Sequence, residues 1–269
     1  MKALRFYDVQ DLRYEDAPDP VIEKPDGVIV KVKAVGICGS DIARYRNLGP
    51  YVPGNVWGHE FCGEVVEVGE GVKNLKPGDR VVGCPNMVCH ECEYCKSGHP
   101  SRCENLNTIG AYVPGAYAEY IKLPEINFVK MADSMSYEQG ALVEPATVAI
   151  HGLYQTSIKM GYEVAVVGCG NIGLMAIAWA KAFGAKRVFA IDIDDAQLQL
   201  AKEFGADVLI NSTDIDFHDE IRKYGNGVDL AIESAGNPFT AARVLGLPHK
   251  GGEVVYMGIP LSLIHISEP

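Results

Sequence analysis

The sequence has no surplus of positive charge. Its 24 lysines and arginines are outnumbered by 35 aspartates and glutamates, so the formal net charge of the 269-residue chain is −11 and its pI is near 5.1. Sequence-independent nucleic-acid binding depends on basic side chains that neutralise phosphates, and we therefore expect no nucleic-acid partner. Hydrophobic residues at 48% and charged residues at 22% are typical of a globular protein and exclude a disordered or collagen-like chain.

The sequence also lacks a long apolar segment. Its most apolar stretch, Val164–Ala180, contains Asn171 and three glycines, and it is shorter than the ~20 residues that a membrane-spanning helix needs. Residues 1–20 contain no apolar core of a signal peptide. We therefore expect a cytoplasmic protein without a membrane partner, whose eight cysteines stay reduced and bind metal rather than form disulfides.

The first part of the chain, residues 1–147, has the pattern of a β domain. Short alternating apolar runs such as Val28–Val35, Arg80–Gly83 and Tyr117–Lys122 are separated by turn-forming glycine, proline and aspartate. This pattern predicts an all-β barrel or sandwich. Near the end of this part, Ser136 is followed three residues later by Gln139, which predicts a helix that begins with a capping box.

In residues 148–260, strands and helices alternate. The strand Val164–Val167 and the helix Gly173–Phe183 begin a series that ends with the strand Glu253–Gly258. Five strands linked by helical crossovers predict a parallel, doubly wound sheet, so the expected fold class of the whole chain is α/β plus β. Such dinucleotide-binding sheets usually have about six strands, and we expect the last strand to be missing here.

The last residues, 261–269, show a different pattern. Their sequence, LSLIHISEP, continues neither a strand nor a helix period, and its codons can be read as the transposon end used in sequencing-library adapters. We expect a non-native tail on a truncated chain, and the alternative is an ordinary strand and loop. In a truncated chain Glu253–Gly258 would be an exposed sheet edge, which promotes aggregation.

Four cysteines form the strongest metal-binding signal. Their spacing, Cys-x2-Cys-x2-Cys-x7-Cys, brings four thiols within fifteen residues. Four thiolates at about 2.3 Å complete a tetrahedral zinc site, and such closed sites are structural. An iron–sulfur cluster and four incidental buried cysteines are the alternatives. The four residues are Cys89, Cys92, Cys95 and Cys103, and we expect His90 and His99 between them to face solvent.

A glycine-rich motif directly follows the strand Val164–Val167 and opens a helix. In this context GCGNIG is typical of a dinucleotide-binding turn, in which a pyrophosphate approaches the backbone N–H groups at the helix N-terminus. Cys169 occupies a variable position of the motif and is expected to pack in the core. The expected cofactor-binding residues are Gly168, Gly170, Asn171, Ile172 and Gly173.

Asp192 lies nineteen residues after Gly173, at the end of the next predicted strand. A carboxylate at this place accepts hydrogen bonds from the ribose hydroxyls of NAD and repels the 2′-phosphate of NADP. No lysine or arginine follows before Lys202, so we expect NAD rather than NADP. The alternative is that Asp192 is only a turn residue ahead of Asp194 and Asp195.

Several motifs together resemble those of zinc-dependent medium-chain dehydrogenases. They occur in the same order as in that superfamily, and the similarity covers residues 1–260. Within the superfamily the chain is most similar to the polyol branch, which includes sorbitol (L-iditol) and galactitol-1-phosphate dehydrogenases. The motifs are GICGSD, GHEFCGEVVEVGEGV, PGDRVV, the four-cysteine segment, LVEPATVAIHG and VVGCGNIG.

The resemblance implies a GroES-like catalytic β-barrel over residues 1–147, with a structural zinc lobe at 84–106. An NAD-binding Rossmann domain would follow over residues 148–260. It also implies a catalytic zinc bound by Cys38, His59 and Glu144, with Glu60 as a neighbouring carboxylate that can move onto the metal. The implied cofactors are therefore two zinc ions per chain and NAD.

The implied reaction is the oxidation of a secondary alcohol of a polyol or polyol phosphate to a ketone, with hydride transfer to NAD. Ser40 corresponds to the hydroxyl that relays the alcohol proton to solvent, and Asp41 to a carboxylate that orients His59. The resemblance also implies that the full-length form is a homodimer or homotetramer.

The sequence says least about the substrate. A phosphorylated substrate would need a nearby cation, and Arg44 and Arg46 are candidates, with solvated surface positions as the alternative. L-threonine 3-dehydrogenase is an enzyme alternative, and a zinc-stabilised nucleotide-binding protein without activity is the non-enzyme alternative. Turnover of a substrate panel with NAD would separate these. The candidate polar side chains of a substrate cleft are Tyr45, Tyr51, Glu60 and Tyr117.

Overall fold

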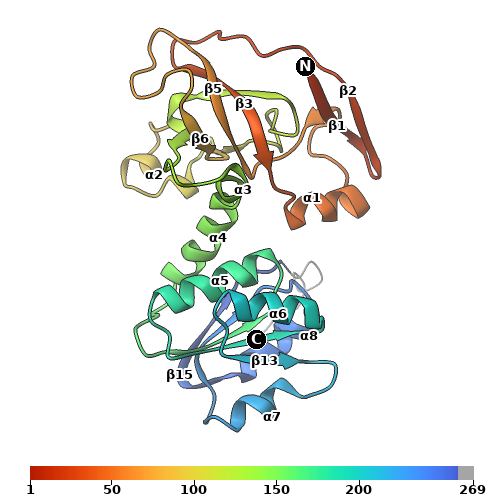
Figure 1. The fold of residues 1–269 in the computed structure, drawn as a ribbon, viewed down its shortest axis with the longest axis vertical. Helices are drawn as coiled ribbons and strands as arrows, with labels where there is room; N and C mark the ends of the chain where they lie inside the picture. The colour runs from red at the N-terminus through yellow and green to blue at the C-terminus, as the bar shows by residue number, and fades with distance from the viewer. Residues whose placement is uncertain (260–269) are drawn as a thin grey trace. The chain divides into compact units, whose positions relative to one another are not determined.

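The computed structural model describes residues 1–259. Its contacts divide into two compact units, Met1–Glu144 and a second unit that begins at Pro145 (Figure 1). The sequence pattern puts the change of domain at residue 147, close to this division. The non-native tail expected over residues 261–269 lies outside the described residues.

The first unit is built on two antiparallel sheets, with strand orders β10-β6-β5-β3-β9 and β2-β1-β4. In the larger sheet Val30 pairs with Val65 on one side and with Ile121 on the other. These side chains form a buried cluster with Phe61 and Val81. The strands are β1 Lys2–Asp8, β2 Asp11–Asp16, β3 Gly27–Val35, β4 Asn55–Val56, β5 Phe61–Val68, β6 Arg80–Gly83, β9 Tyr120–Pro124 and β10 Phe128–Lys130.

The predicted strand Tyr117–Lys122 begins later than expected, at the start of β9. Residues 117–119 pair with β1 instead, because the Leu4 N–H donates to the Tyr117 carbonyl at 2.7 Å and the Glu119 N–H donates to the Lys2 carbonyl at 3.1 Å. The chain therefore passes from the smaller sheet to the larger one at this point.

The helix expected after Ser136 is present as α3, Tyr137–Ala141. The Gln139 N–H donates to Ser136 Oγ at 3.2 Å, and the Ser136 N–H donates to Gln139 Oε1 at 2.9 Å. This reciprocal pair is the predicted capping box, which satisfies N–H groups that have no partner within the helix.

The second unit contains the predicted parallel sheet, with the order β13-β12-β11-β14-β15. Val164 in β11 pairs with Val188 on one side and Leu230 on the other, so β11 lies in the middle of the sheet. The strands are β11 Glu163–Val167, β12 Arg187–Asp192, β13 Val208–Asn211, β14 Val228–Glu233 and β15 Pro248–Tyr256.

Helices cover both faces of this sheet, as a doubly wound fold requires. Val164 and Val166 of β11 pack with buried residues of α4, α5 and α6, whereas Ala165 and Val167 pack with those of α7 and of the 3₁₀ turn η4, Val244–Gly246. Side chains along a strand alternate between faces, so one apolar strand supplies two cores. The helices are α4 Val143–Tyr154, α5 Asn171–Ala182, α6 Asp195–Glu203, α7 Phe217–Arg222 and α8 Pro238–Arg243.

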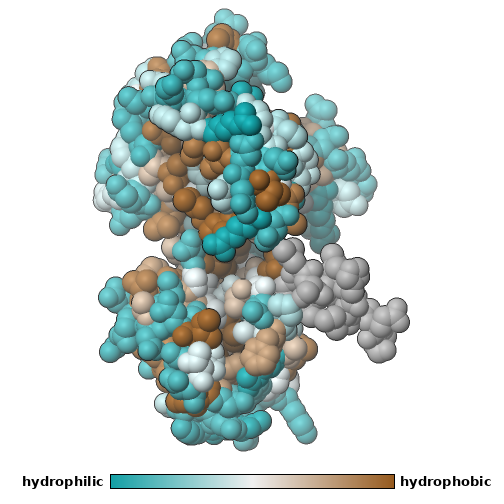
Figure 2. Space-filling model, turned by 90° about the vertical axis from the view of Figure 1, so that its right-hand side faces the viewer, coloured by the Kyte–Doolittle hydropathy of each residue, from teal (hydrophilic) through white to brown (hydrophobic). Residues whose placement is uncertain are grey.

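Hydrophilic residues cover most of the visible surface of each unit, and apolar residues show in patches between them (Figure 2). No helix within residues 1–259 is long and apolar enough to cross a membrane.

Candidate functional site

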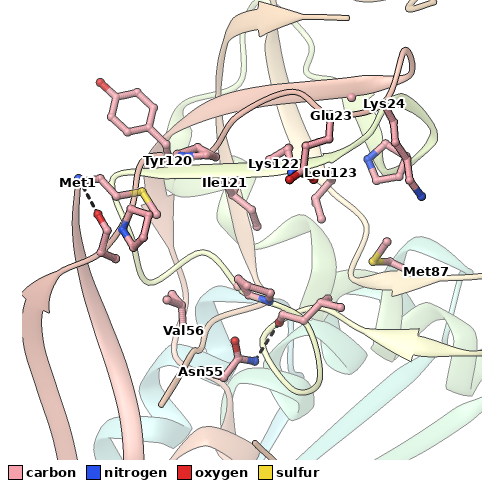
Figure 3. A pocket seen from close by; sticks show the side chains of 18 of the residues that line it. Met1, Glu23, Lys24, Asn55, Val56, Met87, Tyr120, Ile121, Lys122 and Leu123 are labelled. Carbon is pink, nitrogen blue, oxygen red and sulfur yellow. Dashed lines mark hydrogen bonds and ion pairs between the residues drawn. The ribbon is translucent and has the colours of Figure 1, made fainter. Parts of the chain in front are cut away.

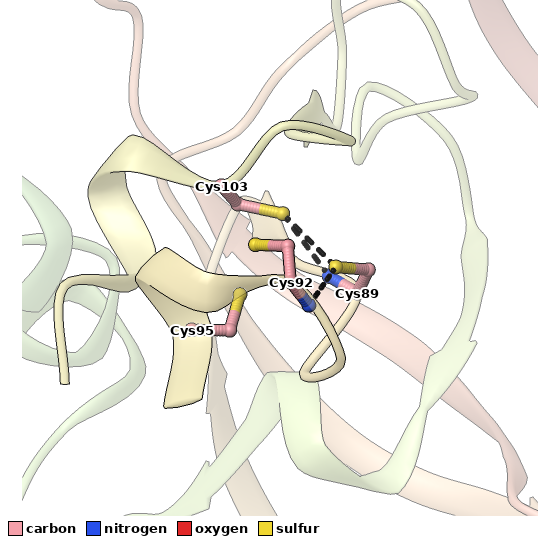
Figure 4. A group of neighbouring side chains, drawn as sticks. All are labelled: Cys89, Cys92, Cys95 and Cys103. Carbon is pink, nitrogen blue, oxygen red and sulfur yellow. Dashed lines mark hydrogen bonds between the residues drawn. The ribbon is translucent and has the colours of Figure 1, made fainter. Parts of the chain in front are cut away.

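The four-cysteine lobe lies in the segment between the short paired strands β7 (Asn86–Met87) and β8 (Asn107–Thr108). It contains the one-turn helix α2 (Glu93–Lys96) and the 3₁₀ turn η2 (Pro100–Arg102). The four sulfur atoms all lie within 4.8 Å of one another, and Figure 4 shows the thiols gathered in one place. A tetrahedron with zinc–sulfur bonds of about 2.3 Å separates its sulfurs by about 3.8 Å, so the group fits a closed zinc site.

Backbone N–H groups face the sulfurs of this lobe. The Cys89 N–H donates to Cys103 Sγ at 3.3 Å, and the Cys92 N–H donates to Cys89 Sγ at 3.4 Å. Backbone N–H groups of Glu91 and Cys92 lower the pKa of Cys89 to about 6, whereas burial and the neighbouring thiols raise the pKa of Cys95 to about 12. The four thiols therefore do not all ionise without a compensating cation, which a bound Zn²⁺ would supply.

His90 and His99 do not belong to this sulfur cluster. Both are exposed, and the His99 ring lies 3.3 Å from the hydroxyl of Ser97. His90 has a positive φ of 58°, which places it in a tight turn between two of the cysteines.

A second group of metal-binding side chains brings together Cys38, His59 and Glu60, whose ligand atoms lie within 4.8 Å of one another. The pairing of β3 with β5 explains their proximity, because Val35 is the partner of Phe61 and the residues next to each pair must meet. Cys38 follows β3 and caps the short helix α1, Gly39–Ala43. His59 and Glu60 directly precede β5.

Glu60 depends on a glycine next to it. Only 5% of Glu60 is exposed, and a Cβ atom at Gly36 would lie 2.2 Å from Glu60 Oε2. Any larger residue at position 36 would therefore displace this carboxylate. Burial raises the pKa of Glu60, while the positive charge of His59 and a hydrogen bond with Cys38 lower it.

Asp41 is buried next to this group, with 7% of its area exposed. Its Oδ2 accepts a hydrogen bond from the Cys38 N–H at 3.0 Å and another from the Tyr117 hydroxyl at 2.8 Å. Its Oδ1 lies 3.9 Å from His59 Nδ1, beyond hydrogen-bond distance, and has no hydrogen-bond partner among residues 1–259. In this structure Asp41 therefore acts on His59 through its charge.

His59 shows that the group attracts a cation. Burial opposes its charged form, but a hydrogen bond with Cys38 and the negative charges of Asp41 and Glu144 outweigh burial and raise its pKa to about 9. The same negative charges favour a cation beside His59. A thiol, an imidazole and a buried carboxylate are also the donor types of catalytic zinc sites, so these residues fit a Zn²⁺ ion.

Glu144, the carboxylate that the sequence motif assigns to zinc, lies in the first turn of α4. It is close enough to exchange electrostatic effects with His59, but it is not part of the three-residue group. Burial raises its pKa, His59 opposes this rise, and the charges of Glu60 and Asp41 add to it. The structure thus surrounds His59 with two carboxylates that could serve as the third ligand, and Glu60 is the nearer to the ligand group.

A pocket of about 200 Å³ lies beside His59 in the first unit. Ser40 and Arg44 contribute to its wall from α1 and from the π-helical turn η1, Arg44–Leu48. Ser40 is exposed, so its hydroxyl can exchange protons with water. Of the four polar candidates from the sequence, Tyr51 lines this pocket, whereas Tyr45 packs against Phe6 with ring centroids 6.3 Å apart.

A larger pocket, of about 730 Å³, lies along strand β9 in the same unit (Figure 3). Met1, Val56, Met87 and Leu123 supply apolar side chains to its wall, and its Lys122 is paired with Glu23 at 2.8 Å. None of the metal-binding side chains described above lines it. The smaller pocket beside His59 is therefore the candidate site, because His59 of the metal-binding group lines it and no member of that group lines the larger pocket.

The glycine motif forms a tight turn between β11 and α5. Gly168 has a positive φ of 94°, and a Cβ atom there would lie 2.6 Å from the Ala235 nitrogen. A Cβ atom at Gly173 would lie 1.9 Å from the Gly168 carbonyl oxygen. Gly170 caps α5 and is exposed together with Asn171, which leaves the helix N-terminus open to an anionic group such as a pyrophosphate.

Asp192 lies at the end of β12 and holds two loops together. Its Oδ2 accepts a hydrogen bond from the Cys169 N–H at 2.6 Å, and its Oδ1 accepts from the N–H groups of Ile193 at 2.7 Å and Asp194 at 3.0 Å. The sequence predicts ribose binding for Asp192 and leaves a turn residue as the alternative. The hydrogen bonds from Ile193 and Asp194 are those of a turn residue, and the bond from Cys169 adds an anchoring contact to the glycine motif.

Both units of the chain match known protein families. Residues 24–133 match the alcohol dehydrogenase GroES-like domain, and residues 171–268 match the zinc-binding dehydrogenase family. Sorbitol dehydrogenase from Bacillus subtilis (strain 168) is 39% identical over 267 residues, which cover 97% of this chain and 75% of that protein.

The chain belongs to the zinc-binding alcohol dehydrogenases. (R,R)-Butanediol dehydrogenase from Bacillus subtilis (strain 168) is another relative, 38% identical over 273 residues that cover 96% of this chain and 78% of that protein. Galactitol-1-phosphate dehydrogenase from Escherichia coli is a similar solved structure, with a TM-score of 0.90 and 34% identity over 96% of this chain and 75% of that one. The predicted family and fold class are confirmed, and the protein is an oxidoreductase.

Sequence reasoning missed one buried carboxylate of this zinc-binding alcohol dehydrogenase. Glu233 ends β14 and is completely buried. Its Oε1 accepts hydrogen bonds from the Ala235 N–H at 3.1 Å and from the Thr240 hydroxyl at 2.8 Å. The neighbouring Ser234 donates its hydroxyl to the Gly168 carbonyl at 2.6 Å. Glu233 thus holds the turn that packs on the glycine motif, and only its place at a strand end, three residues before a glycine, signals this in the sequence.

Proposed function

We propose that the protein oxidises a secondary alcohol of a polyol to a ketone and transfers hydride to NAD. The observation that carries the proposal is the grouping of Cys38, His59 and Glu60 within 4.8 Å of one another beside a pocket that Ser40 and His59 line. Sorbitol dehydrogenase and butanediol dehydrogenase among the relatives support a substrate with several hydroxyl groups.

Cys38 and His59 would hold a catalytic Zn²⁺ together with a carboxylate from Glu60 or Glu144. When bound, the ion supplies a positive charge that lowers the pKa of an alcohol hydroxyl. Ser40 Oγ would accept the hydroxyl proton and pass it to water. The Asp41 carboxylate, fixed by Tyr117, would keep negative charge next to His59 and so stabilise its contact with a cation.

The four-cysteine lobe would hold a second, structural zinc ion. Its four sulfurs would occupy all four coordination positions of the ion, so none is open to a substrate. A site of this composition stabilises the fold and does not take part in the reaction. The protein would therefore bind two zinc ions per chain.

The glycine motif and Asp192 would bind NAD, which supplies the hydride acceptor. The open N-terminus of α5 would take the pyrophosphate, and the Asp192 carboxylate would face the ribose hydroxyls and disfavour NADP. In the balanced reaction the C–H bond of the alcohol carbon breaks, and its hydrogen would pass to NAD as a hydride with both electrons. The hydroxyl proton would go to solvent through Ser40, and the carbon and oxygen would form the ketone.

A substrate panel with the zinc-loaded protein tests the proposal. Sorbitol, galactitol, their phosphate esters, 2,3-butanediol and L-threonine would each be mixed with NAD or NADP, and NADH or NADPH formation followed by absorbance. We expect turnover of polyols with NAD, loss of turnover after chelation, and recovery after zinc is restored. Turnover of threonine without turnover of any polyol would contradict the proposed substrate class.

A further inference from the structure

Arg44 is a positive side chain in the pocket beside His59. It begins the π-helical turn η1, directly after the helix that Cys38 caps, and it lines the pocket with Ser40 and His59. The polypeptide has a formal net charge of −11, so a cation placed next to the reactive group is a distinctive local feature.

Two contacts fix the Arg44 guanidinium in place. Its Cζ lies 3.3 Å from the centre of the Tyr51 ring, and Nη1 donates a hydrogen bond to the Gly49 carbonyl at 3.0 Å. Tyr51 in turn packs against Tyr112, with ring centroids 5.0 Å apart. The side chain therefore loses less conformational freedom when it binds a ligand than a freely moving surface arginine would.

The remaining N–H groups of Arg44 have no acidic partner in the part of the chain that the structure describes. Within residues 1–259 no carboxylate forms an ion pair with it, although many other basic side chains of the described chain are paired. Asp41 lines the same pocket, but its carboxylate already accepts hydrogen bonds from Cys38 and Tyr117. A half-buried guanidinium without an ion-pair partner among the described residues favours an anionic ligand over a neutral one. A free polyol offers only neutral hydroxyl oxygens to these donors.

We propose that Arg44 binds the phosphate group of a phosphorylated polyol whose hydroxyl reacts beside His59 and Ser40. A phosphate ester carries between one and two negative charges and three acceptor oxygens, which match the planar, multiple N–H groups of arginine. A carboxylate, as in threonine, offers one charge and two oxygens. The inference rests on the proposed function and narrows its substrate class to polyol phosphates.

Arg46 provides the matched control. It carries the same charge on the same turn η1, but it is exposed and does not line the pocket. The sequence offered both arginines as equal candidates for binding a phosphate. Their positions in the structure separate them.

The test compares the variants Arg44→Gln and Arg46→Gln with the unmutated protein on two substrates, galactitol and galactitol 1-phosphate, with NAD. We expect the unmutated protein to prefer the phosphate ester. Arg44→Gln should lower the ratio of kcat/KM for the ester over the free polyol by roughly 10- to 100-fold, mainly through KM, because a charge-assisted hydrogen bond is lost. Arg46→Gln should leave this ratio unchanged.

A binding measurement adds a readout that does not need turnover. Galactitol 1-phosphate without NAD should raise the melting temperature of the unmutated protein and of Arg46→Gln, but not that of Arg44→Gln. If Arg44→Gln is poorly folded by circular dichroism, Arg44→Lys replaces it, and this variant should give an intermediate ratio because the charge stays and the planar donor group is lost.

Three results would overturn the inference while leaving the proposed function in place: equal use of both substrates, an unchanged ratio in Arg44→Gln, or an equal loss in Arg46→Gln. Oxidation of L-threonine that depends on Arg44 would assign the arginine to a carboxylate and also overturn it. Absence of turnover with every polyol would instead contradict the proposed function.

Discussion

The two groups of metal-binding side chains differ in how the chain assembles them. The four-cysteine lobe draws all its sulfurs from residues 89–103, and one loop with two short helical turns brings them together. The group of Cys38, His59 and Glu60 draws on two segments that meet only because β3 pairs with β5. Local spacing therefore specifies the first site, whereas the sheet specifies the second.

This difference has an energetic counterpart. A loop with little core of its own needs its metal in order to fold, because the binding free energy of the ion is also folding free energy. The second group is attached to buried strands whose core includes Val30, Phe61 and Val65. Its donors should remain in place without the ion, so we expect metal loss to affect stability at one site and activity at the other.

His59→Ala would give the largest effect on activity. Removing the imidazole should lower kcat/KM by roughly 1,000-fold or more, because a catalytic metal supplies several kcal/mol of stabilisation to the reaction. The zinc content should fall from two ions per chain to one, with little change in the free energy of unfolding. Steady-state kinetics, elemental analysis and denaturant unfolding measure the three quantities. Activity that survives with one zinc bound would place the reaction elsewhere.

Cys92→Ser would give the largest effect on stability. We expect the free energy of unfolding to fall by more than about 4 kcal/mol, since loss of a structural metal belongs to the severe class of substitutions. Zinc content should fall together with the melting temperature. Cys84→Ser is the matched control, because Cys84 is exposed and outside the sulfur cluster. Equal effects of both substitutions would remove the distinction between the lobe and its surroundings.

Glu60→Ala and Glu144→Ala sharpen the comparison within the second site. The variant that removes the resting ligand should lose the second zinc ion and most of the activity, whereas the other variant should keep the ion and lose activity by roughly 10-fold or less through altered charge near His59. The geometry favours Glu60 as the resting ligand, and the sequence motif favours Glu144. Retention of both zinc ions and of full activity in each single variant would show that neither carboxylate alone is required, because one could replace the other.

Asp192→Asn and Asp192→Ala would give the smallest effect, and they extend the comparison to the cofactor motif. Both remove the negative charge, so both should narrow the preference for NAD over NADP, by roughly 10-fold. Asparagine keeps an acceptor oxygen for the Cys169 N–H, whereas alanine does not. Only Asp192→Ala should therefore raise the KM for both cofactors. Kinetics with NAD and NADP measure both effects, and an unchanged preference would contradict charge repulsion.

The sequence predicts most of the second unit because its signals are local. The side chains of an apolar run such as Val164–Val167 are buried on both faces of the sheet, which marks a central strand. A glycine motif directly after such a run is typical of the turn between a strand and a dinucleotide-binding helix. The α/β class of this unit was predictable in this way, whereas the family was identified from the resemblance of motifs along the whole chain. The start of β9 was not, because residues 117–119 pair with β1, more than a hundred residues earlier in the chain.

The details of the candidate site depended even more on tertiary structure. No pattern in the sequence distinguishes Arg44 from Arg46, or reveals that Tyr117 donates to Asp41 across 76 residues. The same holds for the contact of Asp192 with the Cys169 N–H. Each of these contacts joins segments that are distant in the chain, and a single sequence carries no periodic signal for such contacts.

Gly36 has a consequence for engineering the metal centre. Its backbone is not in the left-handed region, so the backbone does not require glycine. Glycine is required because an oxygen of Glu60 occupies the space that a side chain at position 36 would fill. The size of residue 36 therefore determines whether the Glu60 carboxylate can lie beside Cys38 and His59. In a library randomised at residues 36 and 60, side chains larger than hydrogen at position 36 should survive only with a shorter residue at position 60, so the two positions should vary as one unit. A designer who wants Glu144 as the sole carboxylate donor can thus enlarge residue 36 and shorten residue 60 together, while Cys38, His59 and Glu144 stay unchanged.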